Sequence, residues 1–171
     1  METQKWYQNP EMLVALTALF IGLITAIISV YSAYVDRAYA KASVWPKVEI
    51  SRSHSEKAFS YNVTNKGTGP AIIQYAQITA GDKYLKRWSE LPEFTFISQS
   101  HINNITLPSG QTINPLVYSG EQVADILALD GSISIELCYC SIYGDCWKVS
   151  RTNETVPVEV CTISPELAFS Q

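Results

Sequence analysis

Four cysteines are the side chains of this chain whose types and spacing could support specific chemistry. Cys138 and Cys140 alternate along a run that resembles a β-strand, so both side chains point to the same face of it. Cys146 follows a turn-forming Gly144-Asp145 pair, and Cys161 lies further along the chain. Thiols grouped in this way can bind a metal, form disulfides or remain free in a core.

The spacing and the surroundings of these thiols separate the three interpretations. The pattern C-x-C-x5-C-x14-C matches no common zinc site and no histidine lies nearby, so we predict no metal ligands. A Cys140–Cys146 disulfide would enclose five residues, whereas a two-residue turn at Gly144-Asp145 would hold the two sulfurs too far apart. Free buried thiols would act as small apolar residues. The choice depends on the compartment, because disulfides persist in oxidising surroundings.

The remaining polar residues form no catalytic arrangement in the sequence. His54 and His101 lie far apart in polar surroundings, and no Ser/His/Asp or Cys/His pattern and no paired carboxylates mark a motif. The glycine-rich NKGTGP stretch precedes a strand rather than a helix that could bind phosphate. No ligand is needed to explain this stretch, because Gly67 and Gly69 can adopt positive φ and Pro70 fixes the start of the strand. We therefore expect no enzyme activity, no catalytic residue and no cofactor.

Composition limits the class of protein. The chain has 171 residues, of which 47% are hydrophobic and 16% charged, with a net charge of −4 and a pI near 5.1. Nucleic-acid binding requires a basic face, which this sequence lacks, so we expect no nucleic-acid partner. After an N-terminal part committed to the membrane, the remaining length suits one compact domain. We divide the chain into residues 1–43 and 44–171.

An uncharged apolar run from Met12 to Val35 is long enough to cross a bilayer as a helix. Asn9, Pro10 and Glu11 provide a good helix start. A cleaved signal peptide is the alternative, since small residues at 38–42 could form a cleavage site. Signal peptides have a shorter apolar core and a more basic start, so we predict a single membrane-spanning helix in contact with lipid.

Small residues recur along one face of this predicted helix, with an average spacing of 3.6. Close approach through such residues drives helix pairing in lipid, which would mean self-association or binding to another membrane protein. Alanine and glycine are also common in membrane spans, so this interpretation competes with chance. The candidate helix-packing face consists of Ala15, Ala18, Gly22, Ala26, Ser29 and Ala33.

Basic residues near the ends of the span favour a cytoplasmic domain. Lys5 and the amino group precede the span, whereas Arg37, Lys41, Lys47 and Arg52 follow it. A cytoplasmic domain would favour free buried thiols, because the cytoplasm is reducing. A periplasmic domain is the alternative and would favour disulfides.

From Trp45 onward the apolar pattern changes to period two, and turn signals separate short runs. This pattern predicts a mainly β protein in which one immunoglobulin-like antiparallel β-sandwich follows the membrane helix. Gly120–Asp130 is the stretch that could form a helical turn between strands. The predicted strands are Val44–Arg52, Ala58–Thr64, Ala71–Thr79, Tyr84–Trp88, Glu93–Ser98, Thr112–Ser119, Ser132–Ile142, Cys146–Ser150 and Val156–Ile163.

Three stretches carry a resemblance to known sequences: ASVWPKVEI and YNVTNKGTGPAII, within Ala42–Ile73, and CYCSIYGDCW at Cys138–Trp147. They resemble a broad set of uncharacterised bacterial proteins with an N-terminal membrane helix and a small β-sandwich domain. The resemblance implies a bacterial inner-membrane location and the same architecture. It implies no activity.

Two functions are compatible with these features. A membrane-anchored β-sandwich could be a non-catalytic accessory subunit that binds a protein partner at the membrane. Alternatively, the β domain could be a sensor or effector that binds a small ligand or responds to redox state through its cysteines. The helix face of small residues favours the first function, and the cysteine spacing favours the second.

Overall fold

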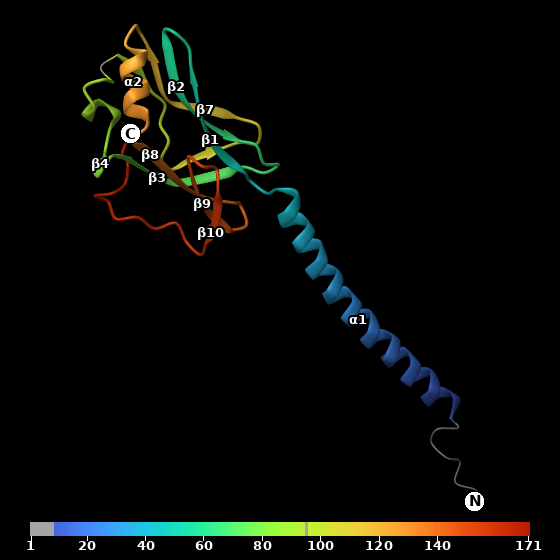
Figure 1. Cartoon of the computed structure of the whole chain (residues 1–171). Helices are drawn as coiled ribbons and strands as arrows, with labels where there is room; N and C mark the ends of the chain where they lie inside the picture. The colour runs from blue at the N-terminus through green and yellow to red at the C-terminus, as the bar shows by residue number, and fades with distance from the viewer. Residues whose placement is uncertain (1–8, 95) are drawn as a thin grey trace, which may run out of the picture. The chain divides into compact units, whose positions relative to one another are not determined.

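The computed structural model of the chain describes residues 9–94 and 96–171 (Figure 1). These residues divide into two compact units, one that ends at Ala42 and contains most of a long helix, and one from Ser43 to Gln171. The predicted fold class is confirmed, because one apolar helix precedes a mainly β unit of two antiparallel sheets. Lys5, which contributed to the charge comparison, lies outside the described residues.

Helix α1 spans Pro10–Ser43 and begins at the predicted residue. Glu11 lies in its first turn and Lys41 in its last, where each charge complements the helix dipole. None of its side chains is buried, and it is long and apolar enough to cross a membrane. Nothing in the structure tests the predicted helix-packing face, so that face stays a prediction.

The described part of the β unit contains ten strands, the short 3-10 helix η2 (Trp88–Glu90) and the α-helix α2 (Val123–Asp130). One sheet has the strand order β1-β2-β7-β5; the other has the order β10-β9-β8-β3-β4, with β6 pairing with β3. All the pairings are antiparallel, which is compatible with an immunoglobulin-like arrangement. The strands are β1 Val48–His54, β2 Ala58–Asn65, β3 Ala71–Ala80, β4 Lys83–Leu85, β5 Ile97–Ser98, β6 Ile105–Leu107, β7 Thr112–Ser119, β8 Ile133–Cys140, β9 Cys146–Ser150 and β10 Thr155–Val158.

Several predicted strand boundaries were wrong, and β6 was missed. In the wrongly assigned stretches, backbone groups form hydrogen bonds within turns and loops and do not pair with a neighbouring strand. For example, the Phe94 N–H donates to the Leu91 carbonyl. β6 is only three residues long, too short for a clear period-two pattern. The helical turn predicted within Gly120–Asp130 is confirmed as α2.

The core lies between the two sheets and is rich in aromatic rings. Trp88 is fully buried and its ring centroid lies 5.6 Å from that of Tyr61, 5.7 Å from Phe94 and 5.3 Å from Phe169. The alternating residues that predicted β2 and β8 point into this core. They are Phe59, Tyr61, Val63, Ile133, Ile135, Leu137 and Tyr139.

The buried side chain of Asn65 fixes the chain just before β1. Its Oδ1 accepts hydrogen bonds from the N–H groups of Lys47 (3.2 Å) and Gly67 (3.0 Å). Its Nδ2 donates to the carbonyls of Gly69 (2.8 Å) and Leu107 (2.9 Å). The side-chain amide of Asn65 therefore forms hydrogen bonds to the start of β1, to the β2–β3 loop and to β6.

Residues 44–47, which we call the junction, lie between α1 and β1 and pack directly on the β2–β3 loop. A Cβ atom on Gly69 would lie 1.9 Å from the carbonyl oxygen of Val44, and one on Gly67 would lie 2.2 Å from that of Trp45. Neither glycine has a positive φ, so the predicted reason for them was wrong. Glycine is required here because backbone meets backbone with no room for a side chain.

We predict that Gly69→Ala lowers the free energy of unfolding by about 2 kcal/mol, because the added methyl group must displace the junction backbone. The measurement is denaturant unfolding of the full-length protein in detergent micelles, followed by tryptophan fluorescence. Gly131→Ala is the matched control, since its Cβ would lie 3.8 Å from the nearest atom and Gly131 has helical φ and ψ. Equal effects of the two substitutions would contradict the steric explanation.

Candidate functional site

All four cysteines are oxidised, in the disulfides Cys138–Cys161 and Cys140–Cys146. The interpretation as free buried thiols was therefore wrong. Cys140 and Cys146 face each other across β8 and β9, with Cα atoms 4.0 Å apart. The loop between them has five residues rather than a two-residue turn, so the strands bring the two sulfurs together.

The two disulfides lie against each other, and we call the four residues the cysteine cluster. After β10 the chain returns toward β8, which places Cys161 beside Cys138. The Sγ atoms of Cys140 and Cys161 are 3.7 Å apart although they are not bonded. The Sγ atoms of Cys140, Cys146 and Cys161 all lie within 4.8 Å of one another. Metal binding would require thiolates, which these disulfides do not offer.

Exposed apolar side chains flank the cysteine cluster. Ile142 and Tyr143 lie in the β8–β9 loop, and Val160 precedes Cys161; all three are exposed, and we call them the apolar patch. The loop itself is ordered by Ser141, whose Oγ accepts hydrogen bonds from the N–H groups of Tyr143 (3.2 Å) and Asp145 (3.3 Å). The loop between Cys140 and Cys146 is therefore structured and carries two exposed apolar side chains.

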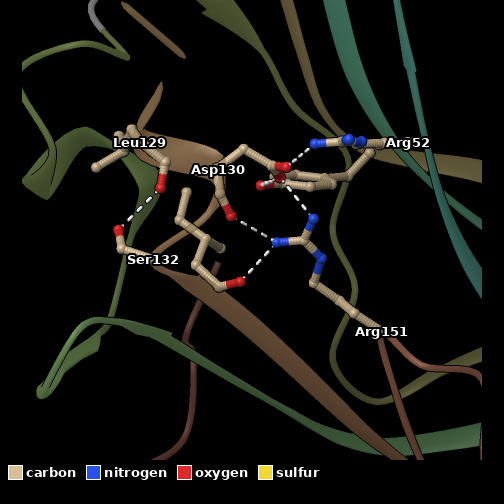
Figure 2. A network of polar contacts seen from close by, with 7 residues as sticks. Arg52, Leu129, Asp130, Ser132 and Arg151 are labelled. Atoms are coloured by element: carbon tan, nitrogen blue, oxygen red, sulfur yellow. Dashed lines mark hydrogen bonds and ion pairs between the residues drawn. The ribbon is translucent and has the colours of Figure 1, made fainter. Parts of the chain in front are cut away.

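A second group of polar residues surrounds the carboxylate of Asp130, at the end of α2 (Figure 2). Asp130 is only 2% exposed and pairs with Arg52 of β1 and with Arg151, whose Nη2 lies 2.7 Å from Oδ1. Tyr61 donates a hydrogen bond of 2.6 Å to the same oxygen. Arg151 also donates to the carbonyls of Asp130 (2.8 Å) and Ile133 (2.6 Å). We call this group the Asp130 network.

Burial and charge act in opposite directions on Asp130. Burial alone would raise the pKa of the carboxyl, but hydrogen bonds from Tyr61 and Arg151 and the two positive charges lower it overall. Burial, followed by the hydrogen bond to Asp130, raises the pKa of Tyr61 far above its ordinary value. The network therefore contains an ionised aspartate and a neutral tyrosine at neutral pH.

The charged and polar groups of the Asp130 network pair with one another across the fold. Both carboxylate oxygens accept hydrogen bonds or ion pairs, and the phenol donates its proton to one of them. Its members come from β1 and β2 of one sheet, from α2, and from the turn after β9 of the other sheet. Sequence reasoning missed it, because the partners are separated by 21 to 78 positions.

The histidines lie where the sequence places them, in exposed positions. His54 lines an open hollow of about 120 Å³ with Ser53, Ser55 and Phe59, among others. Pockets that enclose a small molecule are usually several times larger. His101 does not line this hollow, so the structure does not bring the two histidines together there.

No model of a known protein family matches this chain, and no curated protein sequence matches it. The site therefore has to be interpreted from its own geometry.

We predict that Asp130→Asn lowers the free energy of unfolding at pH 7 by about 3 kcal/mol, because two arginines lose their anionic partner in a buried position. The pKa of Asp130 is lowered from its ordinary 3.8 in the folded protein. Its contribution is therefore present above that pH and is lost as the pH falls through the folded pKa. Wild-type stability should fall in this acid range, and the variant should lack that part of the fall.

Asp125→Asn is the matched control, because Asp125 lies on α2 but is exposed. We expect it to change the free energy of unfolding by less than about 0.5 kcal/mol. Urea unfolding at a series of pH values measures both variants. A stability profile of Asp130→Asn that parallels the wild type below pH 4 would show that the carboxylate is not the group responsible.

Proposed function

We propose that this protein is a non-catalytic accessory subunit of a bacterial inner membrane, in which α1 anchors the β domain and the domain binds a protein partner at the membrane surface. The observation that carries the proposal is the exposed apolar surface of α1, followed at once by the fixed junction. α1 ends at Ser43, and the carbonyl of Trp45 already accepts the N–H of Thr68 in the β2–β3 loop (2.9 Å).

The surface of α1 suits lipid rather than water. Phe20, Ile21 and Ile27 are typical of its side chains, each well over half exposed. Leaving so much apolar surface in water would cost about 25 cal/mol per Å². The short junction then limits how far the β domain can lie from the membrane, because an extended chain covers only about 3.5 Å per residue.

The small-residue face of α1 supports a partner within the membrane. Gly22 and Ala26 are one helical turn apart, and a Cβ on Gly22 would meet no atom within 4 Å. A second helix can approach the backbone closely at such a position and gain packing contacts that lipid tails do not provide. The small-residue face would contact a transmembrane helix of another copy or of another membrane protein, in addition to the partner that the domain binds at the surface.

The two disulfides support a domain on the oxidising side of the membrane, opposite to the side that the basic residues favoured. The charge rule applies mainly to short loops, and long domains are translocated largely regardless of charge. The β unit from Ser43 to Gln171 is such a long domain. We therefore propose a periplasmic location for it.

This location predicts that alkaline phosphatase fused after Gln171 through a flexible linker is active in bacteria, whereas green fluorescent protein at the same point is dark. Alkaline phosphatase requires disulfides and therefore an oxidising compartment. Fusions after Asn9, ahead of α1, are the control and should give the opposite pattern. A fluorescent, phosphatase-negative fusion after Gln171 would place the domain in the cytoplasm.

We predict that Gly22→Leu weakens association with the partner helix about tenfold, because a bulky side chain separates the two backbones. Thr17→Leu is the matched control. Thr17 lies on the opposite face of α1, and its hydroxyl bonds only within the helix, to the carbonyls of Leu13 and Val14.

The measurement is photo-crosslinking in native membranes from a probe at position 26 of full-length protein that carries either substitution. We expect an adduct of defined mass that Gly22→Leu diminishes and Thr17→Leu preserves. An adduct unaffected by Gly22→Leu, or no adduct at all, would count against helix pairing through this face.

A further inference from the structure

We propose that the cysteine cluster is a single thiol–disulfide exchange site. It accepts two electrons from a dithiol and then contains one disulfide in a new pairing, Cys140–Cys161, in place of the two native disulfides. This activity goes beyond partner binding by an anchored domain and does not depend on it. Its substrate class is a reduced pair of thiols, such as those of another protein in the same compartment.

The geometry brings one sulfur of each disulfide into contact. The Sγ atoms of Cys140 and Cys161 are 3.7 Å apart, about the van der Waals contact distance of two sulfurs. Exchange begins when a thiolate attacks a sulfur of a neighbouring disulfide, so contact of this kind is the requirement for it. Cys146 belongs to the same group, since its Sγ lies within 4.8 Å of both of these atoms.

Exposure decides where reduction begins. Cys138 is fully buried, and Cys140 and Cys146 are only 8% and 7% exposed. Cys161 is the one member of the cluster that is partly exposed. Val160, directly before it in the chain, is exposed, as are Ile142 and Tyr143 in the loop after Cys140, and such apolar side chains offer contacts to a polypeptide that carries a dithiol. An external thiolate therefore attacks Cys161 first.

The reaction balances in three steps. The first thiolate of the dithiol attacks Cys161 Sγ, forms a mixed disulfide and breaks the Cys138–Cys161 bond, so that Cys138 takes the electron pair. The second thiolate of the dithiol attacks the dithiol sulfur of the mixed disulfide. The oxidised dithiol then leaves, and Cys161 is released as a thiolate. Cys161 then attacks Cys140, forming Cys140–Cys161 and releasing Cys146. The two protons of the dithiol end on Cys138 and Cys146.

The test is limited reduction of full-length protein in detergent with dithiothreitol, rapid trapping with N-ethylmaleimide, and peptide mapping at low pH. We expect the main species with two labels to carry them on Cys138 and Cys146, with Cys140 linked to Cys161. Labels found only on Cys138 with Cys161, or only on Cys140 with Cys146, would overturn the proposal, since native pairs would then be reduced independently.

Two matched variants test the exchange without reductant. Cys138→Ser leaves a thiol at Cys161 beside the Cys140–Cys146 bond, and Cys161→Ser leaves one at Cys138 instead. We expect Cys138→Ser to contain both Cys140–Cys146 and Cys140–Cys161, and Cys161→Ser to retain Cys140–Cys146 alone. A single native pairing in both variants, with wild-type tryptophan fluorescence, would also overturn the proposal.

Discussion

The constraint on which the structure depends is the contact between two stretches of backbone at the junction. The chain leaves α1 and reaches β1 within a few residues, and the polar groups of those residues must be bonded. Asn65 supplies partners on both sides, and Gly67 and Gly69 allow the two backbones to meet. Trp45 then stacks on Trp147, the neighbour of Cys146, with ring centroids 5.3 Å apart. The junction is thereby connected to β9, the strand that carries Cys146 of the cysteine cluster.

Polar side chains connect the two sheets where their strands end. Asn153, in the turn after β9, accepts the N–H of Ile50 at 2.7 Å and donates to its carbonyl at 3.1 Å, so it occupies part of the open edge of β1. The Asp130 network connects the same strand to α2 through Arg52. The apolar core provides most of the burial, and these contacts fix how one sheet meets the other.

Sequence patterns predicted those parts of the fold that depend on local periodicity. The apolar run predicted α1, and the alternation of Phe59, Tyr61 and Val63 predicted β2, because one buried face imposes a period of two. The patterns failed where distant segments decide the outcome. The redox state of Cys140 depended on a loop geometry and a compartment that spacing does not encode, and Asp130 meets its partners only after folding. The need for Gly69 arises from a chain segment 25 positions away.

The position of Phe169 in the core determines the order of events during synthesis. Its ring packs on Trp88 and its carbonyl accepts a hydrogen bond from Asn103, so the aromatic core stays incomplete until this residue has left the ribosome. At roughly 5–20 residues per second, translation reaches Phe169 about 6 to 25 seconds after α1 is complete. For the periplasmic location proposed above, this order means that α1 reaches the membrane ahead of an unfolded chain. A domain that folds this late could then cross the membrane first and acquire its disulfides afterwards.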